Sequence, residues 1–256
     1  MNDYDHCFDY SESGYDVRPD LGEAHRDVWR QIANAGSWWR GGDRVAIAQE
    51  VRNARNCQLC RDRKEALSPF AISGSHVSSG GGATNLPDVA IDAVHRLTTD
   101  PSRLTQSWLQ ECVAQGLPLE KYVELLGIVV AIVSIDGFHR AMGFALEELP
   151  TPQAGEPSQY RPSGLEEGVA WVPMLPAANA KDDEADLYDG RKQTGNVVTA
   201  MSLVPDSVRI LKTLSAVHYI PMAQVPDRHA NGGRSLSRAQ IELVAGRVSA
   251  LSDCFY

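Results

Sequence analysis

Apolar residues recur at helical spacing through most of the first half of the chain. The clearest case is Ile47, Val51 and Ala54, which fall at i, i+4 and i+7 and give a predicted helix one buried stripe. An earlier helix is predicted from Asp20, a favourable residue for a helix N-cap. No segment of this half shows the apolar–polar alternation of a half-buried strand. The pattern therefore predicts an all-α fold.

Further helices are expected along the rest of the chain. The longest is apolar and spans about residues 119–146, and its most apolar run, 125–135, is far shorter than the ~20 residues of a membrane span. We interpret it as a buried helix of the core. The other expected helices are a short one that begins at Cys57 with Asn56 as its N-cap, and segments near 87–97, 102–115, 196–203, 205–217 and 235–251.

Composition suggests four segments along the chain. Residues 1–19 are polar and aromatic and are predicted to form an N-terminal arm, and residues 20–149 a helical domain. Four prolines within 150–168 indicate that residues 150–194 are a linker and irregular segment. Residues 195–256 are predicted to form a second, partial helical unit. The glycine- and serine-rich stretch at 73–84 is expected to be a flexible loop.

Charge and cysteine content narrow the classes of protein to consider. The 256-residue chain has a net charge of −9 and no run of basic residues, which argues against nucleic acid or anionic membrane as a partner. The N-terminus has neither the positive charge nor the apolar segment of an export signal. The five cysteines are an odd number in a chain without such a signal, which favours a reducing, cytoplasmic location over a disulfide framework.

The pair Cys57-Gln-Leu-Cys60 is the main chemical signal. At the start of a helix the first thiol lies at the positive end of the helix dipole, and the second follows one turn later, close enough to resolve an oxidised partner. Glu50 lies two turns before Cys57 on the same helix face and could serve as a base or relay, or be a solvated surface residue. Alternatively, the two cysteines are buried and inert, or form half of a zinc site. No second C-x-x-C or H-x₃-H supplies its other ligands, so no metal or other cofactor is expected.

The C-terminal helix carries an echo of this region. Aligning Cys254 with Cys57 indicates two copies of one unit, an amphipathic helix followed by a capping polar residue and a cysteine. The pairs that this alignment matches are Val244 with Ile47, Ala245 with Ala48, Val248 with Val51, and Asp253 with Asn56.

Glu242 and Cys254, twelve residues apart with Arg-Val-Ser-x-Leu between them, resemble the core motif of the AhpD-like (alkylhydroperoxidase D, carboxymuconolactone decarboxylase) superfamily. The first half is similar to peroxidase-related members, with the cysteine pair followed by His95-Arg-Leu-Thr-Thr-Asp-Pro and by a helix that ends Ile-Asp-Gly-Phe-His139-Arg. The resemblance covers about residues 20–148 and, in part, 195–256. It implies an all-helical, usually oligomeric protein that uses the cysteine pair to reduce peroxides or exchange disulfides.

The chain departs from the family motif in both copies. The family has a glutamate twelve residues before its first cysteine and a histidine four residues after its second. The first copy has Val45 and Lys64 there, so its relay is incomplete unless Glu50 supplies it. The second copy has Glu242 and Cys254, but the sequence given ends at Tyr256, before a second cysteine. There are three hypotheses for this end: a truncation or frameshift, a naturally short protein, or a UGA codon for selenocysteine. The nucleotide sequence beyond codon 256 would decide among them.

The leading functional hypothesis is a thiol-dependent peroxidase or disulfide oxidoreductase. A hydroperoxide would be its substrate, a protein or small-molecule thiol its reductant, and a homo-oligomer its expected state. The resemblance implies that Cys60 attacks the peroxide and that Cys57 is the resolving cysteine. The alternatives are a non-redox acid–base enzyme of the carboxymuconolactone decarboxylase type, and a degenerate or truncated helical scaffold, which buried and unreactive thiols would favour.

Overall fold

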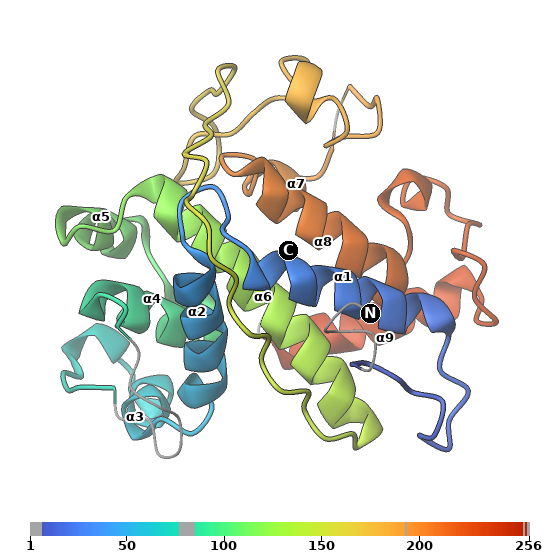
Figure 1. Cartoon of the computed structure of the whole chain (residues 1–256), viewed down its shortest axis with the longest axis horizontal. Coiled ribbons are helices and arrows are strands. Elements are labelled where there is room, and N and C mark those ends of the chain that lie inside the picture. Colours follow the sequence, from blue (N-terminus) through green and yellow to red (C-terminus); the bar gives the residue numbers. More distant parts are fainter. Residues whose placement is uncertain (1–6, 77–84, 193, 253, 255–256) are drawn as a thin grey trace.

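The computed structural model describes residues 7–76, 85–192, 194–252 and 254, and over these residues the protein is helical, without a β-strand (Figure 1). Asp253, Tyr256, the first six residues of the predicted arm and residues 77–84 of the predicted loop lie outside this description. The prediction of an all-α fold is confirmed, while the predicted duplication stays a prediction. The α-helices are α1 (Pro19–Ala33), α2 (Gly41–Ala54), α3 (Gln58–Glu65), α4 (Asp88–Thr99), α5 (Gln106–Ala114), α6 (Leu119–Met142), α7 (Asn196–Thr199), α8 (Pro205–His218) and α9 (Arg238–Leu251).

Helix ends differ from the predictions where a single residue controls the backbone. The predicted N-cap of α3, Asn56, is wrong by one residue, because Cys57 itself is the extended N-cap of that helix. The long helix α6 stops at Met142 instead of continuing to about residue 146. Gly143 adopts a left-handed conformation with φ of 74°, which caps the helix and which glycine tolerates without strain.

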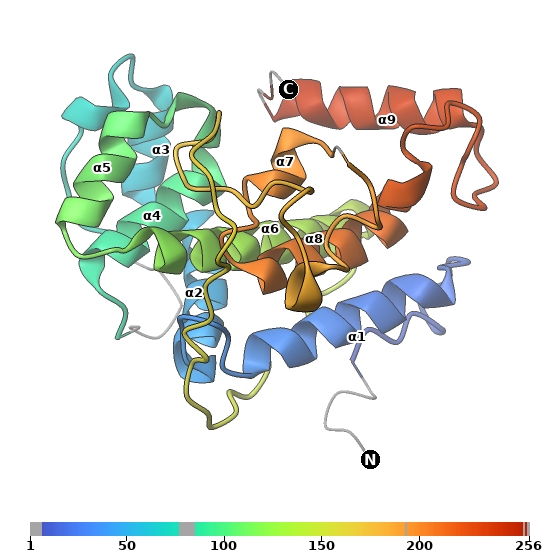
Figure 2. The same ribbon diagram turned by 90° about the horizontal axis from the view of Figure 1, so that it is seen from above.

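Helix α6 is the centre of the molecule. It packs against α2 and α4 on one side and against α8 on the other, and both views show it crossing the middle of the molecule (Figures 1 and 2). Its length and apolar composition would allow it to cross a membrane, but two-thirds of its most apolar window, 67%, is buried inside the protein. Burial of this kind is consistent with a core helix of a soluble protein.

Two buried ion pairs fix α2 against α6. Arg44 pairs with Glu124, and Arg52 pairs with Asp136 at 2.8 Å, with both carboxylates almost fully buried. Such pairs are costly to break singly, because removing one partner leaves a buried charge without a counter-charge. The orientation of α2, which leads into the cysteine pair, is therefore set from both of its ends.

Segments that are far apart in the sequence meet at α6 through a cluster of histidines. Tyr10, from the predicted arm, lies 2.8 Å from His25 and 2.9 Å from His139, and His25 lies 2.8 Å from His218 of α8. Burial lowers the pKa of His25 to about 3 and that of His218 to about 4, so both rings are neutral at physiological pH. The hydrophobic core thus includes residues from the segments that the sequence analysis assigned to the arm, the first domain and the second unit.

Helix α9 stands apart from this core. Ile241 is its one buried residue, and large apolar side chains on it are open to solvent. Figure 2 shows α9 along the side of the molecule opposite α1. The helix therefore forms without the burial that the other helices obtain.

Candidate active site

The candidate site lies where α2, α3 and α4 meet. Helix α2 contributes Glu50, α3 contributes the cysteine pair, and α4 contributes Asp92 and His95, which point the same way because they are three residues apart on one helix. A loop after the short 3₁₀ helix Pro69–Ala71 adds His76. Gly74 lets this loop pass close to α3, since a Cβ there would lie 3.2 Å from Cδ1 of Leu59.

The cysteine pair occupies the first turn of α3. Cys57 is the N-cap, and its carbonyl accepts the backbone N–H of Arg61 at 3.3 Å, while Cys60 follows within the first turn. Both thiols are free and buried, with 1% of Cys57 and 3% of Cys60 exposed. The predicted placement of the pair at a helix start is therefore what the structure has, although neither thiol is openly exposed.

Cys60 is joined to Glu50 through a histidine. Its sulfur lies 3.2 Å from Nδ1 of His95, and Nε2 of the same ring lies 3.0 Å from a carboxylate oxygen of Glu50. All three side chains are buried. A carboxylate on one ring nitrogen holds the imidazole in place and leaves the other nitrogen to accept a proton from the thiol. Glu50 is thus connected to the cysteine pair through one intervening side chain, that of His95, which contacts Cys60.

Cys57 has a similar arrangement of its own. Its sulfur lies 3.5 Å from Nδ1 of His76, whose Nε2 lies 2.8 Å from Asp92. Burial lowers the pKa of His76, but hydrogen bonding to Asp92 and Cys57 raises it above its ordinary value. Burial likewise raises the pKa of Asp92, while hydrogen bonds from His76 and Arg63 hold it far below its ordinary value. Asp92 is therefore a fixed negative charge behind His76.

The two thiols titrate as a pair. Burial raises the pKa of Cys57, but hydrogen bonding to His76 and to Cys60 lowers it by a larger amount, so the pKa falls to about 6. Burial, together with the charge of Cys57, raises the pKa of Cys60 to about 12. Because one thiolate beside another is unfavourable, the metal-free pair holds a single negative charge at neutral pH.

The basic residues after the pair are engaged elsewhere. Arg63 donates to Asp92 at 2.6 Å and to the Ile72 carbonyl at 3.2 Å, so its main contacts hold the carboxylate and the loop. Lys64 donates to the Thr99 carbonyl at 3.2 Å, and Arg61 bonds Gln58 on the surface. The histidines, more than these cations, contact the thiols directly.

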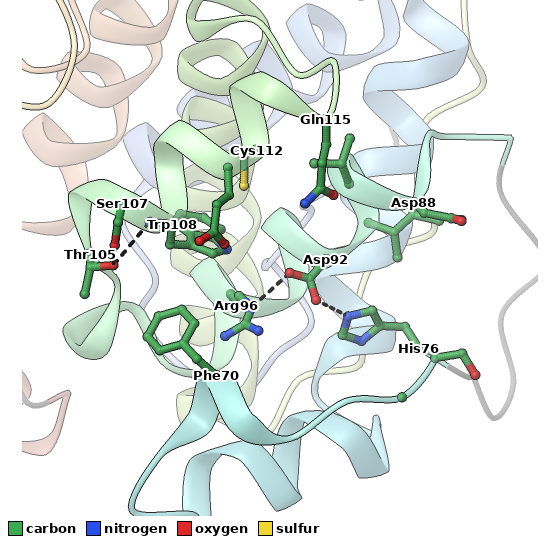
Figure 3. A pocket seen from close by; sticks show the side chains of 15 residues that line it. Phe70, His76, Asp88, Asp92, Arg96, Thr105, Ser107, Trp108, Cys112 and Gln115 are labelled. Atoms are coloured by element: carbon green, nitrogen blue, oxygen red, sulfur yellow. Dashed lines mark hydrogen bonds and ion pairs between the residues drawn. The ribbon is translucent and has the colours of Figure 1, made fainter.

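Two pockets adjoin the site. The larger, about 770 Å³, is walled by α4, α5 and the loop that carries His76, and Figure 3 shows His76 and Asp92 side by side at one edge of it with Cys112 on another wall. The smaller, about 250 Å³, lies between α3 and the end of α4 and is lined by Cys60, Lys64 and Thr99 among others. Cys60 therefore borders a surface pocket.

The residues predicted for the second copy lie elsewhere. Glu242 is exposed on α9, where its carboxylate accepts hydrogen bonds from the Tyr219 hydroxyl and from Arg238, and Cys254 is exposed beyond the end of that helix. Helices α3 and α9 lie in opposite halves of the molecule in both views (Figures 1 and 2). His139, named in the family resemblance, is within hydrogen-bond distance of the Tyr10 hydroxyl and the Ala145 carbonyl.

His76 and His95 are the site residues that sequence reasoning missed. His76 carries no local signal because it lies in a glycine-rich loop, and His95 was noted for the family resemblance without a role. A histidine was sought four residues after Cys60, where Lys64 stands. His95 lies 35 residues after Cys60, on the next long helix, so only a search for histidines on neighbouring helices would have found it.

Four side chains of the site could together hold a metal ion. We call them the Cys₂His₂ cluster, and their donor atoms all lie within 4.8 Å of one another; its members are Cys57, Cys60, His76 and His95. Two chemistries are thus open to the same atoms, thiol redox and metal coordination.

Neither family models, nor curated proteins, nor solved structures gave a match to the chain. The function has to be argued from the site itself.

Proposed function

We propose that the protein is a thiol-dependent oxidoreductase that reduces hydroperoxides at Cys60, with Cys57 as the resolving thiol. The observation that carries the proposal is that each buried thiol contacts its own histidine, and each of these histidines contacts a carboxylate. Buried cysteines that only fill space need no such partners, whereas a nucleophilic thiol needs a base that is held in place.

The first step uses the small pocket beside Cys60. His95 takes the proton of the Cys60 thiol through Nδ1 as the Cys60 sulfur attacks an oxygen of the hydroperoxide, so a second free thiolate does not form beside that of Cys57. The O–O bond breaks as the S–O bond forms, so the sulfur is oxidised to a sulfenic acid and the substrate leaves as an alcohol with the proton that His95 held. Glu50 keeps the imidazole oriented throughout, through its 3.0 Å contact with Nε2.

The second step joins the two cysteines. The Cys57 thiolate attacks the oxidised sulfur of Cys60, an S–S bond forms, the S–O bond breaks, and the hydroxyl group leaves as water with one proton. His76 holds that proton in reach because its Nδ1 lies 3.5 Å from Cys57. A thiol reductant, either a protein dithiol or a small thiol, then returns both cysteines to the reduced form by two exchange reactions.

The resemblance to the AhpD-like superfamily supports the same assignment. It gives the pair a redox role and the second cysteine the attack on peroxide, and His95 with Glu50 occupies the place of the relay that the motif itself lacks here. A cytoplasmic location, a thiol partner and a homo-oligomeric state belong to the same proposal.

Two alternatives compete with it. An acid–base enzyme would need a free base facing a pocket, and both ring nitrogens of His76, at the edge of the large pocket, are already within hydrogen-bond distance of Cys57 and Asp92. A helical scaffold would account for the burial of both thiols, but it gives no reason for two histidine–carboxylate pairs around them.

Single and double cysteine variants test the proposal. Cys57→Ser should stop at the sulfenic acid, so a dimedone adduct on Cys60 should appear after one equivalent of hydroperoxide, as measured by mass spectrometry. Cys60→Ser should give no adduct at residue 57 and no catalytic consumption of hydroperoxide in the presence of a dithiol.

Cys7→Ser is the matched control, because Cys7 is also a buried cysteine but lies outside the pair and outside both pockets that adjoin the site. It should keep the wild-type rate. Hydroperoxide consumption that persists in the Cys57→Ser, Cys60→Ser double variant would refute the redox assignment.

A further inference from the structure

The Cys₂His₂ cluster has sulfur–nitrogen distances close to those of a tetrahedral metal site. Three sulfur–nitrogen distances across it are 3.5 Å from Cys57 to His76, 3.8 Å from Cys60 to His76, and 3.2 Å from Cys60 to His95. Around Zn²⁺, with Zn–S near 2.3 Å and Zn–N near 2.0–2.1 Å, tetrahedral angles put sulfur and nitrogen about 3.5–3.6 Å apart. The three observed distances average close to that value, so these donor pairs are already spaced nearly as they would be around the ion.

The donors are supplied by three separate parts of the fold. The thiols come from the first turn of α3, one imidazole from the loop after Pro69–Ala71, and the other from α4. Both imidazoles present Nδ1 to the sulfurs. The periodicity of one helix cannot bring these four ligand atoms together, so the packing of the three parts against one another has to do so.

The second layer of contacts matches the first. Each imidazole has its other nitrogen against a carboxylate, His76 at 2.8 Å from Asp92 and His95 at 3.0 Å from Glu50. Histidines that bind metals almost always contact a carboxylate, carbonyl or water in this way, because the contact fixes the tautomer and aims the free lone pair at the ion. Asp92 is held in turn by Arg63 at 2.6 Å and by Arg96 at 2.8 Å.

The donor set selects the ion. Two thiolates with two imidazoles in a tetrahedron suit Zn²⁺, whereas Mg²⁺ and Ca²⁺ require oxygen ligands. Four protein donors also leave no position for water or substrate, which is the pattern of structural and not of catalytic zinc. We propose that the Cys₂His₂ cluster binds one Zn²⁺ ion in the reduced protein, in a closed site that fastens α3 and the following loop to α4.

Zinc at this site would govern the thiol chemistry, a consequence that rests on the proposed function. With both sulfurs bound to the ion, each is a weaker nucleophile, so the zinc-bound protein reacts with a peroxide more slowly than the metal-free protein. When a hydroperoxide does oxidise the pair, the two thiolates lose two electrons and form a disulfide. The hydroperoxide gains these two electrons and takes two protons from water to become an alcohol and water, and Zn²⁺ is released because a disulfide is no longer a thiolate ligand.

Metal binding to the full chain is the direct test. Reduced, metal-free protein titrated with Zn²⁺ under anaerobic conditions should bind one ion per chain, as measured by elemental analysis after gel filtration. Co²⁺ in its place should give the intense visible bands of a tetrahedral site and the near-ultraviolet charge-transfer band of thiolate–cobalt bonds. The Cys57→Ser, Cys60→Ser double variant should lose that charge-transfer band.

Asp92→Asn keeps all four ligands and tests the second layer. It should weaken zinc affinity by about 10- to 100-fold, since the loss of an outer carboxylate typically has that effect. His229→Ala is the control, because His229 is exposed and outside the cluster, and it should bind zinc like the wild type. Far-UV circular dichroism of each variant establishes that helix content is retained.

The outcomes separate the zinc site from the redox proposal. Wild-type protein that binds neither Zn²⁺ nor Co²⁺ would overturn the zinc site, and so would full zinc binding by the double cysteine variant, because the ion would then lie elsewhere. Hydroperoxide consumption is measured on the metal-free protein, so its presence or absence bears on the proposed function alone. Zinc release on addition of one equivalent of hydroperoxide, followed with a chromogenic chelator, tests the link between the two.

Discussion

The two helix-and-cysteine units that the sequence alignment predicts have opposite surroundings in this protein. In α2, Ile47 and Val51 are 0% and 1% exposed, whereas their counterparts in α9, Val244 and Val248, are 58% and 57% exposed. The same apolar spacing thus produces a core helix in one place and an uncovered helix in the other. Spacing makes a helix amphipathic, but other elements have to cover its apolar face.

The polar residues of the two units differ in the same way. Glu50 is buried and contacts His95, which contacts Cys60, while Glu242 is exposed and contacts Tyr219 and Arg238. The first unit has α4 and α6 against it, and α4 brings the histidine. Over the described residues, α9 has no comparable helix against it. A glutamate and a cysteine at the family spacing therefore do not by themselves make a site.

The largest difference should appear in stability. Val51→Asp places a carboxylate in the core and should lower the free energy of unfolding by about 4 kcal/mol or more, whereas Val248→Asp, on an exposed face, should change it by less than about 0.5 kcal/mol. Urea unfolding followed by circular dichroism measures both. If Val51→Asp does not fold, Val51→Ala and Val248→Ala should still differ, by about 2 kcal/mol. Equal effects at the two positions would show that α9 is covered in solution.

Next in size is the effect of the two glutamates on catalysis. Glu50→Gln removes the carboxylate that orients His95 and should lower the rate of hydroperoxide consumption by about 100-fold, within the range expected for loss of a general base. Glu242→Gln should leave the rate within about twofold of the wild type, because its partners are not cysteines. Steady-state kinetics with excess dithiol gives both values. A greater loss in Glu242→Gln than in Glu50→Gln would move the active site to α9.

Thiol reactivity should separate the units by about tenfold or more. In the metal-free native protein a bulky aromatic disulfide should label exposed Cys254 fast and the buried pair slowly, since access limits the reaction. A small methylthiolating reagent should reach Cys60 through its pocket, and peptide mass spectrometry identifies the site. Failure of both reagents to label the pair, with all five cysteines labelled after denaturation, would favour the scaffold alternative.

The smallest effect concerns the ion pair on α9. Hydrogen bonds from Tyr219 and Arg238 lower the pKa of Glu242 below its ordinary value of 4.5. A lowered pKa in the folded state gives stability that is present above the unfolded pKa and is lost as the pH falls through the folded one. Glu242→Gln should therefore cost at most about 0.5 kcal/mol at pH 7, since the pair is exposed, and nothing at pH 2. An unchanged cost at pH 2 would assign the effect to packing.

Much of the fold follows from local sequence. The i, i+4, i+7 stripe of α2 is buried as predicted, and the apolar segment beginning at residue 119 is the central helix. Helix ends were less accurate, because they depend on single residues such as Cys57 and Gly143. The cysteine pair and Glu50 were also named from sequence, and the structure joins Glu50 to the pair through one histidine.

By itself, the sequence determined what short-range physics controls: the helical class, the buried face of α2 and the place of the cysteine pair at a helix start. These depend on hydrogen bonds and contacts within about four residues. Only the tertiary structure decided that His76 and His95, 16 and 35 residues from Cys60, are its partners, and that α2 is covered while α9 is not. Contacts near 3 Å between separate elements depend on how helices pack on α6, and that packing is set by the whole core at once.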